Sequence, residues 1–393
     1  MSATARGAPE VRLPQAGGGL AAYRLGPPCP YAPPPAPPTT RVCFAAAHVV
    51  RDPLADADPR GPARLDWGTT LAYRRVLWDH GLGVAEAMDT AQRGMGLDWS
   101  ATRELIVQAG VEATAVGGRI ACGAGTDQLP AGAASSPAAI RGAYEEQCEL
   151  IEDHGAQVVL MASRALVGCA RGADDYRELY GDLVRGCRAP VILHWLGEAF
   201  DPALRGYWGS DDLDEASEVL LSIIAAHADR IDGIKVSLLD AQREVALRRR
   251  LPAGVRMYTG DDFNYPELIA GDAHGHSDAL LGIFDAIAPA AAAAVTELDA
   301  GRVDRYRAIL EPTVALSRHI FAAPTQYYKV GIVFLAYLNG HQSHFQLVGG
   351  LESARSTLHL SRLLVLADRA RVLGDPELAA HRMAAVLAVA GVV

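Results

Sequence analysis

The sequence predicts an α/β protein whose eight parallel strands close into a (β/α)8 TIM barrel with a C-terminal helical extension. Two observations predict this fold. Short apolar runs of strand length alternate with amphipathic segments over roughly 250 residues, and beyond about residue 285 only helical patterns remain. Strands that alternate with helices indicate a parallel sheet with right-handed crossovers. Eight such units fit a closed barrel better than an open sheet.

Three regions follow one another along the chain. Residues 1–38 are rich in Gly and Pro, so we expect an extended, poorly ordered N-terminal arm without catalytic residues. The barrel is expected over residues 39–288 and the helical region over residues 289–393. The expected strands are Arg41–Val49, Gly83–Met88, Arg119–Gly123, Val158–Ala162, Pro190–His194, Gly233–Val236, Val255–Thr259 and a weaker one around Gly275–Ser277.

Composition bears on partners and location. Half of the 393 residues are hydrophobic, and the formal net charge is -10, which disfavours nucleic acid or an anionic membrane as the main partner. The first twenty residues lack the apolar segment of a secretory signal, and no apolar run has the length of a membrane span. Six scattered cysteines without a CxxC pair favour free thiols. We therefore expect a cytoplasmic protein with a small-molecule substrate and neither a metal nor another cofactor.

Lysine is rare in this chain. Of 36 Lys and Arg residues only two are lysines, Lys235 and Lys329, and Lys235 lies in the apolar run Ile231–Leu239. A desolvated lysine, unlike arginine, can lose its proton and form a Schiff base with a carbonyl carbon. The alternative is a strand-end lysine whose amine reaches water. Lys329, in the helical region, is expected to be structural.

Polar residues follow the predicted strands, where the catalytic residues of (β/α)8 barrels lie. Any single Asp, Ser or Thr there can instead cap the next helix, but so many ionisable groups on one barrel face favour an active site. In chain order they are Asp89, Thr90 and Gln92, then Thr126, Asp127 and Gln128, then Ser163 and Arg164, His194 and Trp195, Lys235 and Ser237, Asp261 and Asp262, and His276 and Ser277.

Over residues 40–345 the order of these segments resembles the dihydrodipicolinate synthase and N-acetylneuraminate lyase superfamily of class I aldolases. Gly233-Ile-Lys235-Val-Ser-Leu-Leu-Asp240 stands in the place of the Schiff-base lysine motif Gly-Ile-Lys-Glu-Ala-x-Gly-Asp. Pro190-Val-Ile-Leu193 and Thr259-Gly-Asp-Asp262 resemble the motifs of strands 5 and 7. The segments 86–94, 194–197 with 206–209, and 258–265 resemble more closely an uncharacterised, mainly actinobacterial branch labelled a domain of unknown function.

The resemblance implies a Schiff-base lyase with Lys235 as nucleophile, and a homo-oligomer, either a dimer or a tetramer. The parts that bind pyruvate-type substrates differ, however. His194 replaces the proton-relaying tyrosine of strand 5, the carboxylate-binding arginine would fall near uncharged Ala199, and Asp89 would repel a carboxylate. Ser163 and Arg164 stand in place of the strand 4 tyrosine pair.

We therefore expect a carbon–carbon or carbon–oxygen lyase, an aldolase or dehydratase of carbohydrate metabolism, that acts on a keto-sugar or keto-acid sugar rather than in the dihydrodipicolinate reaction. Lys235 would be the nucleophile and His194 would transfer protons near neutral pH. The other strand-end residues would bind substrate: Asp89, Thr90, Gln92, Thr126, Asp127, Gln128, Ser163, Arg164, Trp195, Ser237, Asp261, Asp262 and Ser277.

Two alternatives stay open. One is a divalent-metal-dependent barrel aldolase, isomerase or hydrolase, with ligands drawn from Asp89, Asp127, His194, Asp262, Asp272, His274 and His276. The other is a catalytically inactive sugar-binding barrel, because a fold alone does not establish activity. The retention of Lys235 in a lysine-poor chain argues against the inactive barrel. The pair His341 and His344 is expected to be a polar helix end.

Overall fold

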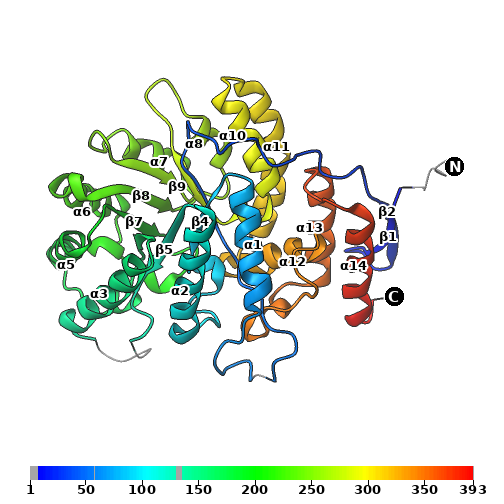
Figure 1. Ribbon diagram of the computed structural model, residues 1–393, viewed down its shortest axis with the longest axis horizontal. Coiled ribbons are helices and arrows are strands. Elements are labelled where there is room, and N and C mark those ends of the chain that lie inside the picture. Colours follow the sequence, from blue (N-terminus) through cyan, green and yellow to red (C-terminus); the bar gives the residue numbers. More distant parts are fainter. Residues whose placement is uncertain (1–7, 57, 130–134, 393) are drawn as a thin grey trace.

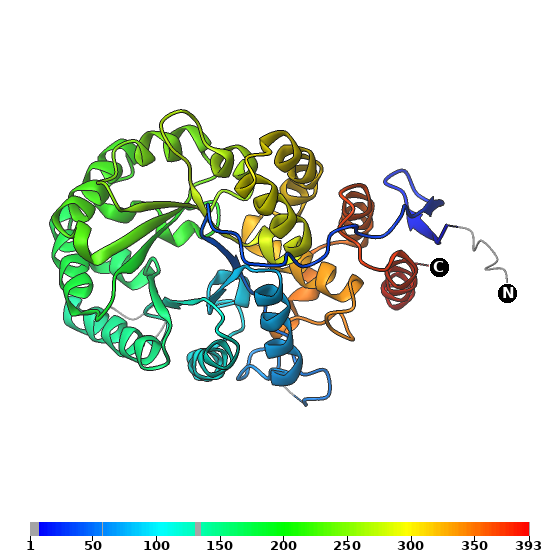
Figure 2. The same ribbon diagram turned by 45° about the horizontal axis from the view of Figure 1, so that its top comes forward.

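The computed structural model describes residues 8–56, 58–129 and 135–392, and it confirms the barrel (Figures 1 and 2). Eight parallel strands close in the order β10-β3-β4-β5-β6-β7-β8-β9. Their bounds are β3 (Cys43–Ala46), β4 (Gly83–Glu86), β5 (Ile120–Ala124), β6 (Gln157–Leu160), β7 (Val191–Leu196), β8 (Ile231–Ser237), β9 (Arg256–Thr259) and β10 (Asp278–Leu281).

Helices follow the strands and form the outer layer of the barrel (Figure 2). They are α1 (Trp67–Asp79), α2 (Trp99–Val116), α3 (Pro137–Asp153), α4 (Arg164–Cys169), α5 (Ala173–Gly186), α6 (Leu213–Ala226), α7 (Ala241–Arg248), α8 (Tyr265–Ala270) and α9 (Ile283–Ala286). Short polar side chains begin many of them, because each accepts a hydrogen bond from an amide of the first turn. Examples are Asp66, Asp98, Ser136, Ser163, Asp212 and Asp240.

Alternate residues of each strand fill the inside of the barrel. An interior cluster around Phe44, Val159, Ile192 and Leu280 is almost completely buried. Lys235 pairs in register with His194 on β7 and with Tyr258 on β9. Since Ile192 faces inward, His194 two residues later does so as well, and the register brings Lys235 to the same level.

The eighth strand was predicted three residues too early. The segment around Gly275–Ser277 is a tight turn, in which Gly275 has a φ of 140° and bonds back to Asp272. The strand itself, β10, begins at Asp278 and bonds to β3 and β9. His276 and Ser277 therefore precede the strand and lie at the opposite end of the barrel from the predicted site.

The N-terminal arm is also more regular than expected. Strands β1 (Glu10–Pro14) and β2 (Leu20–Arg24) form an antiparallel hairpin. The Tyr23 hydroxyl donates to the Asp368 carboxylate at 2.6 Å, and the Gly26 amide donates to the same group at 2.8 Å. The hairpin thus packs on the C-terminal helices of its own chain, at the far right of Figure 1.

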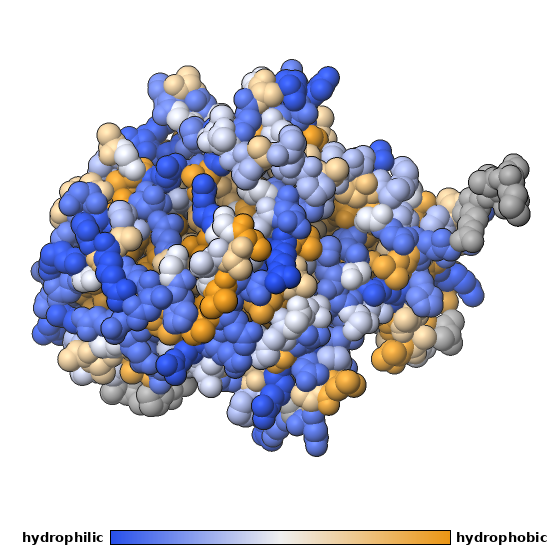
Figure 3. Space-filling model, viewed as in Figure 1, coloured by the Kyte–Doolittle hydropathy of each residue, from blue (hydrophilic) through white to orange (hydrophobic). Residues whose placement is uncertain are grey.

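The predicted helical C-terminal part is confirmed. It comprises α10 (Ala288–Asp299), α11 (Val303–Ile320), α12 (Tyr328–Leu338), α13 (Thr357–Arg369) and α14 (Pro376–Val389). Every residue of α12 is buried, because this helix packs against α9, α11, α13 and α14. Among the described helices none combines the length and apolar character of a membrane span. Hydrophilic residues cover most of the face in Figure 3, with smaller hydrophobic areas between them.

A buried ion pair fixes the chain where β4 leads into the site. The Arg74 guanidinium on α1 binds both carboxylate oxygens of Glu86, at 2.8 and 2.9 Å, and both side chains are fully buried. Glu86 also accepts the Ala87 amide at 2.9 Å. Removing one partner of such a pair leaves an uncompensated buried charge.

Glu86→Gln should therefore lower the free energy of unfolding by about 3–5 kcal/mol, because the Arg74 cation stays buried without a counter-charge. The matched control is Glu112→Gln, which breaks the surface pair with Arg75 (2.6 Å) and should cost at most about 1 kcal/mol. Urea unfolding of both variants measures the difference. Equal, small losses in the two variants would contradict the role given to the buried pair.

Candidate active site

Lys235 lies on the interior face of β8 and is 7% exposed. Its amine makes no hydrogen bond or ion pair with any residue that the structure describes. Burial lowers the pKa of this amine below its ordinary 10.5, while the negative charges of Asp89 and Asp262 act in the opposite direction. The group is therefore a buried amine without a clamping partner, which is the state in which lysine becomes nucleophilic.

His194 stands beside Lys235 and is fully buried. Its Nε2 lies 3.2 Å from the Ser237 hydroxyl oxygen, and its Nδ1 has no partner in the described part of the chain. Burial, and then the charge of Lys235, hold the pKa of His194 well below 6.5. The imidazole is thus neutral near neutral pH, with one nitrogen as donor and one as acceptor.

Asp262 is a buried carboxyl group in the loop after β9. It accepts the Ile283 amide at 2.9 Å, which ties this loop to the end of β10. Burial raises the pKa of Asp262 to about 7, against the lowering effects of backbone amides and Lys235. This group can therefore exchange a proton near neutral pH.

The segment after β4 connects the barrel to the C-terminal helices. Asp89 and Thr90 lie in the 3-10 turn Asp89–Ala91. The Thr90 hydroxyl lies 2.8 Å from the Tyr328 hydroxyl, and the Tyr328 ring stacks on Phe321 at 4.4 Å. Burial raises the pKa of Tyr328 well above 10, and Asp89 adds to this effect. Tyr328 thus covers the carboxyl end of the barrel from α12.

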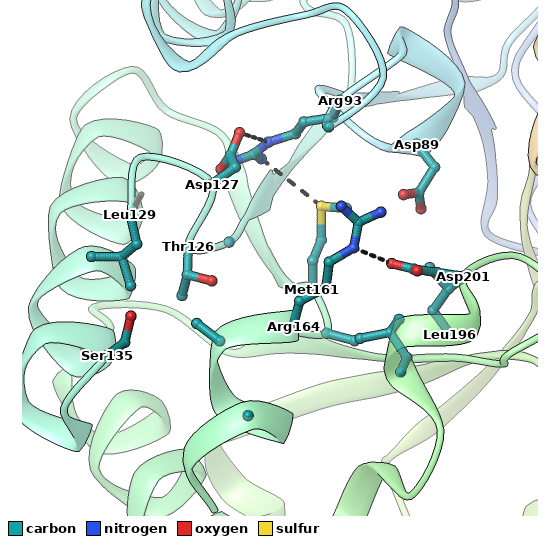
Figure 4. Close-up of a pocket in the computed structure, with 16 residues that line it drawn as sticks. Asp89, Arg93, Thr126, Asp127, Leu129, Ser135, Met161, Arg164, Leu196 and Asp201 are labelled. Atoms are coloured by element: carbon teal, nitrogen blue, oxygen red, sulfur yellow. Dashed lines mark hydrogen bonds and ion pairs between the residues drawn. The ribbon is translucent and has the colours of Figure 1, made fainter. Parts of the chain in front are cut away.

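A cavity of about 660 Å³ opens at the carboxyl ends of β4 to β7. Its polar lining includes Asp89, Arg93, Thr126, Asp127, Arg164 and Asp201, and Met161 and Leu196 form part of its apolar lining (Figure 4). Lys235 is not a lining residue. It lies one level deeper, since it aligns with His194, two residues before Leu196. The lysine is thus beneath the cavity, with a small exposed fraction.

Two ion pairs shape the cavity wall. Arg93 binds the Asp127 carboxylate through Nε at 3.0 Å, and Arg164 binds Asp201 through Nε at 2.5 Å (Figure 4). Burial alone would raise the pKa of Asp127, but the Arg93 guanidinium outweighs it and lowers that pKa. Thr126 adds a hydroxyl, which lies 2.6 Å from that of Ser163. The wall therefore offers charged and hydroxyl groups to a polar ligand.

Five residues that were predicted to bind substrate make structural contacts instead. They are Gln92, Gln128, Trp195, Asp261 and Ser277. Gln92 bonds the backbone of Val348 in both directions, at 2.8 and 3.1 Å. Gln128 donates to the Ala143 carbonyl at 2.8 Å on α3. Asp261 accepts three bonds from Phe263 and Asn264 and closes a turn.

The other two of these five residues lie outside the site for geometric reasons: Trp195 points away from the barrel interior, and Ser277 lies at the opposite end of the barrel. Trp195 alternates with His194 on β7, so it faces outward and packs edge-on against Trp208 with ring centres 6.4 Å apart. Ser277 donates to Glu244 at 2.7 Å before β10 begins. The period of two in a strand and the later start of β10 explain these two corrections.

The candidate metal ligands do not converge. Within the described ranges, no three His, Cys, Asp or Glu side chains form a group that could hold a metal ion. Asp272, His274 and His276 lie in the turn before β10, away from Asp89 and Asp262 at the carboxyl ends of the strands.

Several site residues were not predicted from the sequence. Arg93 and Asp201 line the cavity, although Arg93 lies within the segment 86–94 that was noted for its resemblance. Tyr328 comes from α12, far along the chain, next to the second lysine. Lys329 itself is 3% exposed, and its amine donates to the Gln326 carbonyl at 3.1 Å and to the Met95 sulfur at 3.2 Å. Burial lowers the pKa of Lys329 to about 8.

Gly260 leaves room for the Lys235 side chain. A Cβ atom at this position would lie 2.2 Å from the Ser237 hydroxyl and 2.9 Å from Lys235 Cε. Gly260→Ala should therefore displace both groups and lower the rate at which a carbonyl reagent modifies Lys235. Gly142→Ala on α3 is the matched control, because a Cβ there meets no atom within 4 Å. Mass spectrometry of labelled protein measures both variants, and an unchanged rate in Gly260→Ala would contradict this packing.

Comparison with known proteins agrees with this architecture. The family model described as "Protein of unknown function (DUF993)" matches residues 11–392, and no curated protein matches. Among solved structures, YagE from Escherichia coli K12, a protein of the dihydrodipicolinic acid synthase family in complex with pyruvate, is 12% identical. The alignment covers 85% of this chain and 99% of YagE, with a TM-score of 0.65.

Dihydrodipicolinate synthase from Aquifex aeolicus is also 12% identical, with 85% and 99% of the two chains covered and a TM-score of 0.63. The DapA-2 enzyme from Bacillus anthracis is 13% identical, with 82% and 98% covered and a TM-score of 0.60. These similarities confirm the (β/α)8 barrel that the alternation of strands and helices predicted. The chain belongs to the DUF993 family, and its barrel has the fold of the dihydrodipicolinate synthases.

Proposed function

We propose that this protein is a class I aldolase-type lyase in which Lys235 forms a Schiff base with a hydroxylated carbonyl substrate. The observation that carries the proposal is the Lys235 amine, which is buried inside the barrel without an ionic partner among the described residues and lies one level below Leu196 of the cavity lining. Burying a cation without a direct counter-charge is costly, so burial shifts the Lys235 pKa downward and makes the neutral amine more accessible.

The neutral amine adds to the substrate carbonyl carbon and gives a carbinolamine, which loses water to give an iminium ion. The carbinolamine hydroxyl takes up a proton so that it leaves as water, and two neighbouring groups can transfer protons here. His194 is a neutral imidazole in contact with Ser237, and Asp262 has a pKa of about 7. The iminium then accepts the electrons of an adjacent bond, either a carbon–carbon bond or the carbon–hydrogen bond of an elimination.

The cavity favours a substrate with several hydroxyl groups. Asp89, Asp127 and Asp201 accept hydrogen bonds, and Arg164 and Thr126 donate them. The acidic groups oppose the binding of a carboxylate near Asp89. A keto-sugar or keto-acid sugar that turns its hydroxyls toward this wall fits better than pyruvate. The solved structures share only the fold with this chain, and the polar lining of its own cavity is what favours a hydroxylated substrate.

Borohydride reduction in the presence of dihydroxyacetone, pyruvate or a 2-keto-3-deoxy sugar acid should give a stable mass adduct on Lys235. Because the chain contains only two lysines, peptide mass spectrometry assigns the site directly. Lys235→Arg should give no adduct and no turnover, although it keeps the positive charge.

Three outcomes would count against this function. An adduct on Lys329 alone would refute the nucleophile assignment, as would turnover retained in Lys235→Arg. Folded protein that never forms an adduct would contradict the lyase proposal. If sugars raised its melting temperature in that case, the inactive sugar-binding barrel would be the better account.

The trapping rate should depend on pH through the Lys235 amine. Only the neutral amine reacts, so the rate should rise with pH to a plateau. The midpoint of this rise should lie below pH 10.5, because burial lowers the Lys235 pKa. The Asp262 carboxylate raises that pKa, so Asp262→Asn should move the midpoint to lower pH. The exposed control Asp304→Asn should keep the wild-type midpoint. An unchanged or higher midpoint in Asp262→Asn would show that the two groups are not coupled.

A further inference from the structure

Among the described residues three carboxylates line the cavity, and one of them has no partner in that part of the chain. Asp127 is bound by Arg93 and Asp201 by Arg164. The Asp89 carboxylate makes no hydrogen bond or ion pair with any residue in ranges 8–56, 58–129 and 135–392. In Figure 4 it is directed into the same part of the cavity as Arg164 and Asp201. It is thus the carboxylate on this wall that is free to act on a ligand.

The backbone around Asp89 is held in place. The Asp89 carbonyl accepts the Gln92 amide at 3.0 Å, and the Gln92 side chain is itself bound to Val348. The next residue, Thr90, has its hydroxyl 2.8 Å from that of Tyr328. The carboxylate therefore projects from a turn that the C-terminal part of the chain holds at Thr90 and Gln92.

Both lysines of the chain lie within electrostatic reach of this carboxylate. The charge of Asp89 acts on Lys235 from the barrel side and on Lys329 from α12. The Lys329 amine also sits 4.9 Å from the centre of the Tyr328 ring and has no carboxylate within ion-pair distance in the described part of the chain. A carboxylate on the cavity wall that interacts with the buried amine is placed to act as a base on a ligand bound there.

We propose that Asp89 is the catalytic base that takes the proton from the carbon next to the iminium, so that the chain's unpaired cavity carboxylate works together with its unpaired interior amine. This inference rests on the proposed Schiff-base function. The electron pair of the broken C–H bond forms a C=C bond, and the C=N electrons move to nitrogen, which gives a neutral enamine. The proton resides on Asp89, and its return to carbon restores the iminium. In carbon–carbon cleavage the same carboxylate takes the proton of the substrate hydroxyl while the released electron pair forms the enamine.

The other titratable groups near the lysine fit this role less well. His194 lies at the level of Lys235 with a strongly lowered pKa, so it is a weak base. One oxygen of Asp262 accepts the Ile283 amide at the start of α9, and its pKa of about 7 leaves Asp262 partly protonated near neutral pH. Among the residues that the structure describes, Asp89 combines an unpaired carboxylate with a place on the cavity wall.

Hydrogen–deuterium exchange into dihydroxyacetone in D2O tests the inference, because exchange needs the base but not the natural substrate. NMR follows the loss of the carbon-bound proton signal, and borohydride trapping of dihydroxyacetone on Lys235 is measured in parallel. Asp89→Asn should lower the exchange rate by roughly 100-fold or more, since general base catalysis contributes that much to proton transfer. It should not lower the trapping rate, because the loss of the Asp89 charge favours the neutral Lys235 amine. Asp89→Glu should restore part of the exchange, and the exposed control Asp79→Asn should match wild type.

The parallel assays separate the two proposals. Wild-type protein that traps dihydroxyacetone without exchanging its protons would overturn the base assignment, and so would normal exchange in Asp89→Asn. Loss of both trapping and exchange in Asp89→Asn would show that Asp89 acts on the Lys235 amine instead, which also overturns it. Wild-type protein that neither traps nor exchanges would contradict the Schiff-base function itself.

Discussion

An amine buried without an ionic partner is the constraint on which this site depends. Lys235 stands among interior residues of a closed barrel, and the acidic groups that raise its pKa, Asp89 and Asp262, act on it through space rather than by a hydrogen bond or ion pair. A protonated amine in such a place has lost its water without gaining a counter-ion, so the neutral form becomes accessible. The absence of a side chain at Gly260 provides the space that this arrangement needs. A direct ion pair would have produced a structural lysine instead.

The C-terminal helices contribute residues to the site that the barrel strands form. The eight strands supply Lys235, His194 and the loop carboxylates, but α12 brings Tyr328 over Thr90 and places Lys329 near Asp89. This helix is completely buried, so its side chains are positioned by packing on several neighbours rather than by one loop. The site therefore belongs to two parts of the chain that are more than 200 residues apart in sequence, as the 238-residue separation of the Thr90–Tyr328 contact shows.

The sequence predicted most of the fold and the centre of the site, for identifiable reasons. Seven strands were visible as apolar runs, and the lysine was conspicuous because the chain otherwise uses arginine. The prediction failed where the sequence shows no strand pattern, and where the alternation of side chains along a strand was not taken into account. The run at residues 275–277 was taken for the strand that begins at Asp278, and Trp195 was grouped with His194 although neighbouring strand residues face opposite ways. Tyr328 could not be placed, because no local pattern shows which helix will pack over the barrel.

The pKa of Lys235 is the quantity that tests this account most directly. With only two lysines in the chain, protein labelled with ¹³C-lysine gives two side-chain signals in an NMR titration, and Lys329→Arg assigns them. The Lys235 signal should titrate below 10.5, and the Lys329 signal should titrate near 8. A Lys235 midpoint at or above 10.5 would mean that the amine is held as a cation, and the proposed nucleophile would be lost.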